Sequence, residues 1–231
     1  MIRRLAVRWP DPRPFLDRDG RPVRILAVSD ERDAAVDDAR NRDALGRIDL
    51  VLGCGDLSPD YLDFLASCLN APLSYVRGNH DRKPPWPQPP QLPAETAGAH
   101  VVNGVRLLAL PWPGSDRGPV RRLEVDAWSQ VLRLAADPLM RPRPCLVMSH
   151  VPPRGVGDGN ATGFHRGFDA YRLLLDRTRP PLWVHGHTNL AGVHDWRNDH
   201  DGSIVANATG GILVELVPAD DRAEQGDPAP S

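Results

Sequence analysis

Short polar clusters stand directly after apolar runs at five places in this chain, and that order constrains the fold more than any other feature. The apolar runs predict buried strands at Val23–Val28, Ile48–Cys54, Pro72–Val76, Cys145–Met148 and Leu182–Val184. The clusters that follow them are Ser29-Asp30, Gly55-Asp56, Gly78-Asn79-His80-Asp81, Ser149-His150 and His185-Gly186-His187. Strands that end in a carboxylate, carboxamide or imidazole bring these groups together at one edge of a sheet. Such an arrangement suits a divalent metal site for phosphate chemistry.

At these residues the chain resembles the calcineurin-like metallophosphoesterases, which are known by the blocks D-x-H, G-D, G-N-H-[DE], a lone His after a strand, and G-H-x-H. The resemblance covers roughly residues 23 to 217. Its most specific element is Gly78-Asn79-His80-Asp81, and Gly186-His187 stands downstream of His150 in the expected order. The resemblance implies an α/β fold, a four-layer α-β-β-α sandwich.

Two blocks depart from the family pattern. The first reads Asp30-Glu31-Arg32, so that Arg32 stands where the family has His. The last reads Gly186-His187-Thr188-Asn189, so that Asn189 stands where the family has its second His. Both departures fall on positions that bind the same metal in the family, and we call that position site one.

The resemblance implies two sets of ligands. Site two would keep its whole set, which is Asp56, Asn79, His150 and His187. Site one would keep Asp30 and the shared Asp56, but it would lack both imidazoles. Loss of two neutral nitrogen ligands should weaken a site for manganese, iron or zinc, because imidazole suits these metals better than carboxamide does.

His80 is implied to be a catalytic residue. In the family the Asn of this block ligates a metal and the His contacts the substrate phosphate. We therefore expect His80 to protonate the leaving-group oxygen or to stabilise charge in the transition state. Asp81 is the expected partner that orients the His80 ring.

Arg32 admits three readings. Its guanidinium could lie between Asp30 and Asp56, replace the first metal and bind a phosphate oxygen, which would make it catalytic. It could instead point to solvent while Asp30 caps a loop. A full two-metal centre, completed by Asp33, His165 or water, is the third.

The loop Val151–Arg166 supplies candidate substrate contacts. Arg154, His165 and Arg166 precede a predicted helix, and a helix N-terminus near arginines favours anions. An exposed polar loop explains the same residues. His185 has no counterpart among the family's ligands, and we expect a strand residue or a group that supports the ligands.

Composition bounds the domain organisation. The chain has 231 residues, of which 41% are hydrophobic and 25% charged, as in one globular domain. We expect an irregular N-terminal lead-in over residues 1–22, because Pro10, Pro12 and Pro14 interrupt it. The metallophosphoesterase domain should span residues 23–217. Residues 218–231, rich in Pro, Gly and acidic side chains, should form a disordered tail.

Further elements follow from local patterns. Apolar residues at helical spacing predict helices at Asp60–Leu69, Leu123–Ala135 and Phe168–Arg177. Asn103-Gly104 between two apolar runs predicts a hairpin. The proline-rich segment Arg82–Pro93 should be an extended loop.

Partners and location are expectations from charge and composition. No run approaches the ~18 apolar residues of a membrane span, and the N-terminus lacks the pattern of a secretory signal. Three cysteines without a CxxC pair indicate reduced thiols in the cytoplasm. The net charge of −2 gives no general attraction to nucleic acid or to an anionic membrane.

Together these features favour a metal-dependent phosphoesterase that acts on a phosphorylated small molecule or a nucleotide. The substrate could be a phosphodiester or a phosphomonoester, and the metal could be manganese, iron or zinc. A nuclease of the same fold is an alternative, although the charge does not indicate one. A regulatory module that binds metal or phosphate without catalysis is another.

Overall fold

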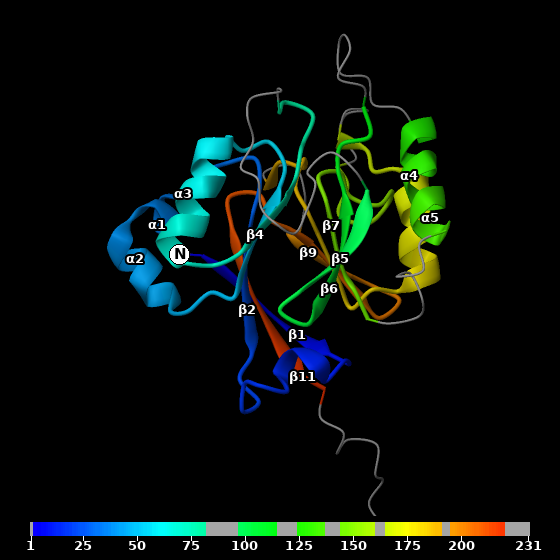
Figure 1. Cartoon of the computed structure of the whole chain (residues 1–231). Coiled ribbons are helices and arrows are strands. Elements are labelled where there is room, and N and C mark those ends of the chain that lie inside the picture. The colour runs from blue at the N-terminus through cyan, green and yellow to red at the C-terminus, as the bar shows by residue number, and fades with distance from the viewer. Residues whose placement is uncertain are drawn as a thin grey trace, which may run out of the picture.

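The structure is a computed structural model that describes residues 2–81, 97–114, 124–136, 144–159, 165–190 and 195–219. Two β-sheets pack face to face, and helices cover the outer side of each (Figure 1). The four-layer α-β-β-α sandwich expected from the sequence is confirmed. No described helix has both the length and the apolar character needed to cross a membrane.

The first sheet has five strands in the order β1-β11-β2-β3-β4. Their bounds are Arg3–Trp9 for β1, Val23–Val28 for β2, Leu50–Cys54 for β3, Leu73–Val76 for β4 and Ile212–Pro218 for β11. Strands β2, β3 and β4 are parallel neighbours, so their carboxyl ends lie at the same edge. The helices that cover this sheet are α1 (Ala34–Asp37), α2 (Ala39–Leu45) and α3 (Pro59–Leu69).

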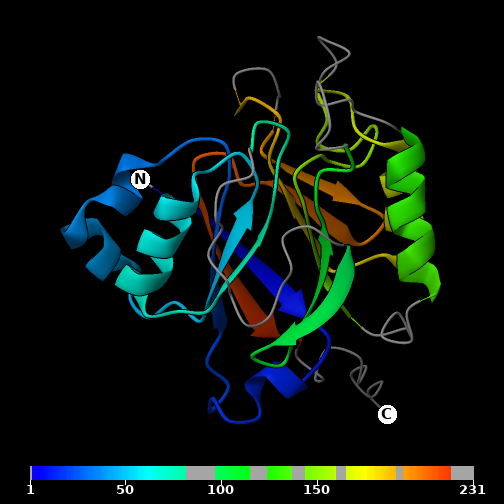
Figure 2. The ribbon, with the colours of Figure 1, turned by 45° about the horizontal axis from the view of Figure 1, so that its top comes forward.

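The second sheet has six strands in the order β5-β6-β7-β8-β10-β9. Their bounds are Gly98–Val102 for β5, Val105–Leu110 for β6, Leu146–Ser149 for β7, Leu182–His185 for β8, Arg197–His200 for β9 and Ser203–Asn207 for β10. Strands β7 and β8 are parallel neighbours. Helices α4 (Glu124–Ala136) and α5 (Asp169–Thr178) cover the outer face of this sheet, as the turned view in Figure 2 also shows.

Apolar side chains of both sheets meet in a shared core. Ile25 and Leu52 of the first sheet and Leu107 and Met148 of the second belong to one cluster of buried residues. Two further clusters lie beneath the helices on the outer faces. Because the apolar runs are buried on both faces, they read as continuous hydrophobic stretches in the sequence.

Local sequence explains where elements begin and end. Helix α3 starts with Pro59, and the Ser58 hydroxyl accepts a hydrogen bond from the backbone N–H of Tyr61 at 3.3 Å. The predicted hairpin between β5 and β6 is confirmed, and its turn residues Asn103 and Gly104 have φ angles of 50° and 80°. Such positive φ angles are those of a two-residue hairpin turn.

The expected irregular lead-in is wrong for residues 3–9. These residues form β1, which pairs in parallel with β11. Leu5, Val7 and Trp9 are buried while the residues between them are exposed, so the segment alternates with the period of a strand. The arginines and prolines around it concealed that period. Most of the expected tail and the whole of the expected loop at residues 82–93 lie outside the described residues.

Candidate metal centre

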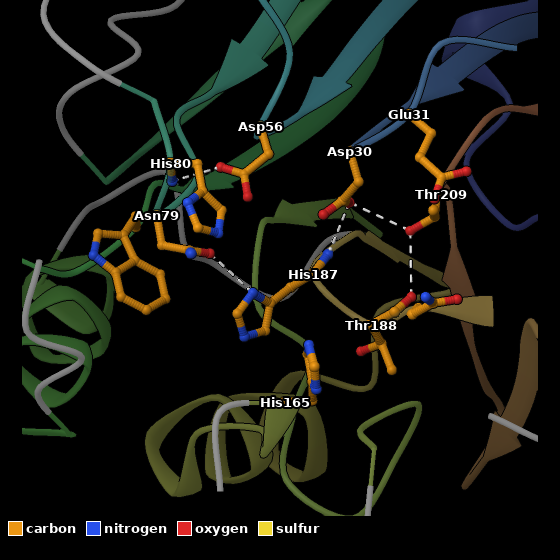
Figure 3. Close-up of a pocket in the computed structure, with 11 residues that line it drawn as sticks. Asp30, Glu31, Asp56, Asn79, His80, His165, His187, Thr188 and Thr209 are labelled. Carbon is orange, nitrogen blue, oxygen red and sulfur yellow. Dashed lines mark hydrogen bonds between the residues drawn. The ribbon is translucent and has the colours of Figure 1, made fainter. Parts of the chain in front are cut away.

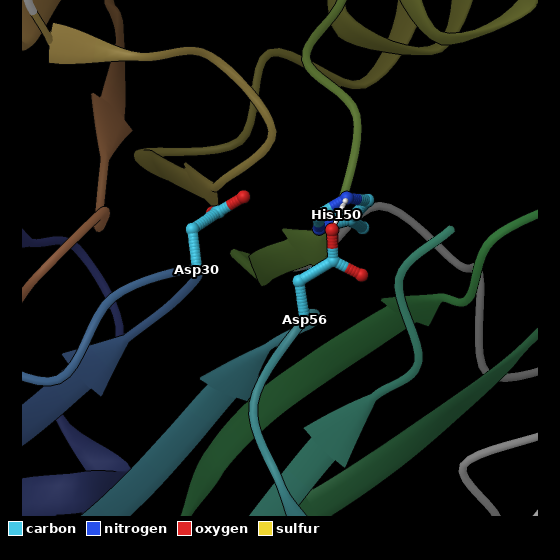
Figure 4. Close-up of side chains that lie close together, drawn as sticks. All are labelled: Asp30, Asp56 and His150. Atoms are coloured by element: carbon cyan, nitrogen blue, oxygen red, sulfur yellow. Dashed lines mark ion pairs between the residues drawn. The ribbon is translucent and has the colours of Figure 1, made fainter. Parts of the chain in front are cut away.

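The ligand residues come from the carboxyl ends of strands in both sheets, rather than from the edge of one. Asp30 and Asp56 follow β2 and β3, and Asn79 follows β4 shortly afterwards. His150 and His187 follow β7 and β8 of the second sheet. The side chains of the two groups point toward one another (Figures 3 and 4).

Three of these residues have an unusual backbone. The φ angles are 59° for Asp30, 57° for Asp56 and 66° for His187. Residues other than glycine seldom adopt this left-handed region, and when they do they concentrate at functional sites. The Asp30 N–H donates to the Gly55 carbonyl at 3.1 Å, which helps to hold the first of these turns.

The glycines of the sequence blocks are needed because the backbone passes close to the ligands. At Gly55, Gly78 and Gly186 an added Cβ would lie less than 3.0 Å from other atoms, a separation that Cβ atoms essentially never show. The atoms it would meet are His150 Nδ1 at Gly55, Asp56 Oδ1 at Gly78, and Ser29 Oγ and Asp30 Oδ2 at Gly186. The three glycines therefore allow the close packing that brings the ligands together.

Four potential ligand atoms converge around Asn79. Its side-chain oxygen Oδ1 lies 2.8 Å from His150 Nε2 and 3.0 Å from His187 Nδ1. His150 Nε2 is also 3.3 Å from Asp56 Oδ2. The structure thus brings together all four residues expected at site two.

The second nitrogen of His150 explains why this arrangement fits a cation. Nδ1 lies 2.9 Å from the Cys54 carbonyl, which can only accept a hydrogen bond, so Nδ1 carries a proton. The lone pair on Nε2 then faces the oxygens of Asp56 and Asn79, which are themselves acceptors. A proton or a metal ion between them satisfies all three atoms. Metal-bound histidines commonly donate their other N–H to a backbone carbonyl in this way.

Charge pairing shifts the pKa values of both Asp56 and His150. Burial alone would raise the pKa of Asp56, but the hydrogen bond and charge of His150 outweigh it and hold that pKa below its usual value. Burial alone would lower the pKa of His150, which is fully buried, but Asp56 outweighs that effect and raises it. The pair therefore favours an ionised Asp56 and a protonated His150.

Asp30 lies beside this group. One oxygen each of Asp30 and Asp56 and one nitrogen of His150 lie within 4.8 Å of one another. Figure 4 shows the three side chains close together. Asp30 Oδ2 accepts the His187 N–H at 2.9 Å and the Thr209 hydroxyl at 3.3 Å. These bonds link the loop after β2 to the loops after β8 and β10.

The ligands open into a cavity of about 580 Å³ (Figure 3). Its described lining is Asp30, Glu31, Asp56, Asn79, His80, Trp112, His165, His187, Thr188, Asn189 and Thr209. The expected residue His165 is among them, and its ring centroid lies 5.5 Å from that of His187. The predicted site did not include Trp112 and Thr209, although they lie two residues beyond the ends of β6 and β10, and it gave Glu31 and Thr188 no role.

Comparison with known proteins agrees with this geometry. The family model described as calcineurin-like phosphoesterase matches residues 24–190. The chain belongs to the calcineurin-like phosphoesterase family. No curated protein sequence matches it significantly.

Solved structures show the same fold at low sequence identity. The protein TT1561 of Thermus thermophilus is 14% identical over 81% of this chain and 89% of its own, with a TM-score of 0.50. The phosphopantetheinyl hydrolase PptH from Mycobacterium tuberculosis is 15% identical over 90% of this chain and 99% of its own, with a TM-score of 0.51. At such identities the likeness concerns the fold alone.

Arg32, one of this chain's departures from the family pattern, does not take the place of the first metal. Its guanidinium pairs with Asp37 at 3.1 Å and lies over the Tyr61 ring, 4.6 Å from the centroid. Its side chain is 60% exposed, and it is not among the residues that line the cavity. The expectation that it lies between Asp30 and Asp56 is therefore corrected, because an acidic and an aromatic neighbour on α1 and α3 hold it outside.

Asp81 also differs from expectation. Its Oδ2 atom accepts the backbone N–H groups of Asp56 at 2.9 Å and Gly78 at 2.7 Å, rather than a hydrogen bond from the His80 ring. The His80 N–H in turn donates to Asp56 Oδ1 at 2.8 Å. Asp81 thus connects the loops after β3 and β4, while the exposed side chain of His80 lines the cavity.

The two arginines expected to bind substrate lie elsewhere. Arg154 forms ion pairs with Asp169 at 3.0 Å and Glu124 at 3.5 Å, so it joins the loop after β7 to α4 and α5. Arg166 is exposed and, like Arg154, is absent from the described lining of the cavity. In the described structure Arg154 contacts acidic side chains instead of the cavity, and substrate binding by either arginine stays a prediction.

His185 is a fully buried residue of β8. Its Nδ1 lies 2.9 Å from the Gly186 carbonyl. Burial is the main reason that its pKa is lowered to about 4. His185 is therefore a neutral core residue next to the ligand loop.

Proposed function

We propose that this protein is a metal-dependent phosphoesterase that hydrolyses a phosphodiester, a phosphomonoester or a nucleotide with a metal-activated water. The observation that carries the proposal is the convergence of Asp56 Oδ2, Asn79 Oδ1, His150 Nε2 and His187 Nδ1 beside an open cavity. A carboxylate, a carboxamide oxygen and two imidazoles suit manganese, iron or zinc.

The bound metal would supply positive charge and lower the pKa of its water to produce the nucleophile. The protein's own contribution is orientation. Cys54 fixes the protonated nitrogen of His150, and the His80 N–H holds one oxygen of Asp56 so that the other faces the ligand group. These contacts preorganise the ligands and so reduce the cost of assembling them around a cation.

His80 is the proposed catalytic acid. Its side chain is exposed in the cavity, while its backbone N–H is already used by Asp56. An imidazole in this position can donate a proton to the leaving-group oxygen or stabilise charge on the phosphate.

We propose one tight metal site and a second, weaker one. Site two keeps all four ligands that the family uses there. Site one keeps only Asp30 and the shared Asp56. Asn189 lines the cavity where the family has an imidazole, and Arg32 is turned away. Two carboxylates with a carboxamide bind a borderline transition metal less well than a set with imidazoles.

The substrate is proposed to be a phosphorylated small molecule or nucleotide in the cytoplasm. The described lining of the cavity includes the acidic residues Asp30, Glu31 and Asp56 and contains neither arginine nor lysine. A nuclease would need basic side chains along a groove to hold a nucleic-acid backbone, so this lining does not favour one.

Metal analysis combined with turnover of a chromogenic phosphoester tests the proposal. Exhaustive chelation should abolish turnover, and addition of manganese should restore it. His80→Ala should lower turnover about 10²–10⁴-fold with unchanged metal content. The adjacent variant Asn79→Ala should instead lose metal and activity together, because it removes a ligand.

Turnover that survives chelation would refute the metal mechanism. Loss of metal in His80→Ala would show that the roles of His80 and Asn79 are reversed. A metal-loaded protein that cleaves no phosphodiester or phosphomonoester would support a binding module without catalysis.

A further inference from the structure

Helix α4 carries an apolar stripe on the face that points away from the sheets. Val125 is 75% exposed and Leu132 is 65% exposed, and they are two of the five large hydrophobic residues that are exposed in the described chain. In Figure 2 the helix forms one outer side of the molecule. A shallow surface hollow here is lined by Val125, Trp128, Ser129, Leu132, Arg133 and Ala136.

Helical spacing separates this stripe from the buried face of α4. Ala127, Val131 and Leu134 are buried against the sheet and α5. Val125 and Leu132 are seven residues apart, so they lie one above the other on the opposite side. The outer face of α4 thus carries two large apolar side chains in line with each other.

Charged residues flank the stripe in a defined order. Asp126 lies in the first turn of α4 and Arg133 in the last turn. They too are seven residues apart, so both lie on the same flank of the stripe. Within the described part of the chain, neither takes part in a salt bridge, in contrast to Glu124, which pairs with Arg154.

We propose that α4 pairs antiparallel with α4 of a second copy of this chain. A two-fold axis across the middle of the helix places Val125 of each copy opposite Leu132 of the other. The same axis places each Asp126 opposite an Arg133, so that one patch provides two symmetric ion pairs. A patch that complements itself in both shape and charge is what a two-fold interface requires.

Charge order favours a second copy in this orientation over a parallel one. In a parallel pair the two-fold axis would run along the helices and place the flanks that carry Asp126 and Arg133 on opposite sides of the interface. Neither residue would then meet its counterpart, and the two ion pairs would be lost. Ser129, near the middle of the stripe, has a small side chain that lets two helices approach closely.

The size of the surface predicts a weak dimer. A helix of 13 residues is about 20 Å long, and a patch of that length is smaller than a standard stable interface. We therefore expect association at about 10–100 µM rather than at nanomolar concentration. None of the described residues that line the metal cavity belongs to α4, so the dimer does not depend on the proposed activity.

Sedimentation velocity of the full chain from about 1 to 300 µM tests this surface. The unmodified protein should shift from monomer to dimer, and Leu132→Asp should remain a monomer throughout. Leu16→Asp is a matched control, because Leu16 is also exposed, at 73%, but lies outside α4. It should dimerise like the unmodified protein, and circular dichroism should show that both variants are folded.

Charge reversal tests the orientation. Asp126→Arg and Arg133→Asp alone should each weaken dimerisation about tenfold, since each converts two attractive pairs into repulsive ones. An equimolar mixture of the two variants should form a heterodimer as tight as the original dimer, because its pairs are again of opposite charge. The double variant should likewise recover the homodimer.

Three outcomes would overturn the proposal. They are a protein that stays monomeric at 300 µM, a dimer that Leu132→Asp leaves unchanged, and charge variants whose mixture does not recover. Binding of the stripe to a different protein by an otherwise monomeric chain also counts against it.

Discussion

Asp81 connects the two loops that carry Asp56 and Asn79, and Asp81→Ala should therefore destabilise the protein. The substitution leaves the backbone N–H groups of Asp56 and Gly78 without the acceptor that they reach at 2.9 and 2.7 Å. A hydrogen bond to a charged group contributes about 1.5–3 kcal/mol. Burial, however, raises the pKa of Asp81, so part of this gain is offset by desolvation. We expect a loss of about 2–3 kcal/mol for the two bonds together.

Asp81→Asn is the matched control. Both N–H groups reach the same oxygen, and an amide oxygen can accept both, so this variant should lose less than about 1 kcal/mol. Urea unfolding of chelator-treated protein measures the difference, because bound metal would otherwise add its own stabilisation. Melting temperatures should fall by about 5–10 °C for alanine. Equal losses for alanine and asparagine, or none for alanine, would refute the assignment of Asp81 as the connection between the loops.

Three further predictions follow from the structure. Arg32→Ala should change turnover by no more than about twofold, because the Arg32 guanidinium pairs outside the cavity. A hundredfold loss of turnover in steady-state kinetics would instead show that Arg32 acts in the site. Gly186→Ala should lower the metal content and reduce the unfolding free energy in urea by about 1–3 kcal/mol, because the added Cβ would overlap the Asp30 carboxylate. Gly211→Ala is the control: its Cβ would make ordinary contacts, so this variant should retain the metal. His185 is neutral when buried and its pKa is about 4 against an ordinary 6.5, so the unfolded chain binds more protons below pH 6.5. The contribution of His185 to the unfolding free energy should accordingly fall by about 3 kcal/mol between pH 6.5 and 4. A His185→Leu variant with the same slope as the unmodified protein would contradict this.

The strand-end clusters predicted most of the metal centre because its residues depend on chain order alone. A residue that follows a buried parallel strand must lie at the carboxyl end of the sheet, whatever its neighbours are. Asp56 and Asn79 lie together at the end of one sheet for this reason, and so do His150 and His187 at the end of the other. The sequence could not show that two different sheets supply them, because strand order in a sheet depends on contacts between distant segments.

Strand β1 shows how local composition can conceal an element. Leu5, Val7 and Trp9 alternate with arginine and alanine, and the prolines that follow suggested an irregular segment. Pairing with β11, more than 200 residues later in the chain, gives this short strand its hydrogen bonds and a buried face. A local pattern cannot report a partner at that distance.

Long polar side chains were the least predictable part of the site. Arg32 and Arg154 could reach several acceptors from their backbone positions, and the ones they contact are Asp37, Glu124 and Asp169. Strand periodicity indicated an α/β fold, and the order of the sequence blocks carried the resemblance that implied the four-layer form and the types of ligand. The tertiary structure alone decided which cation faces which carboxylate, since that choice depends on the burial and separation of groups that the fold brings together from distant parts of the chain.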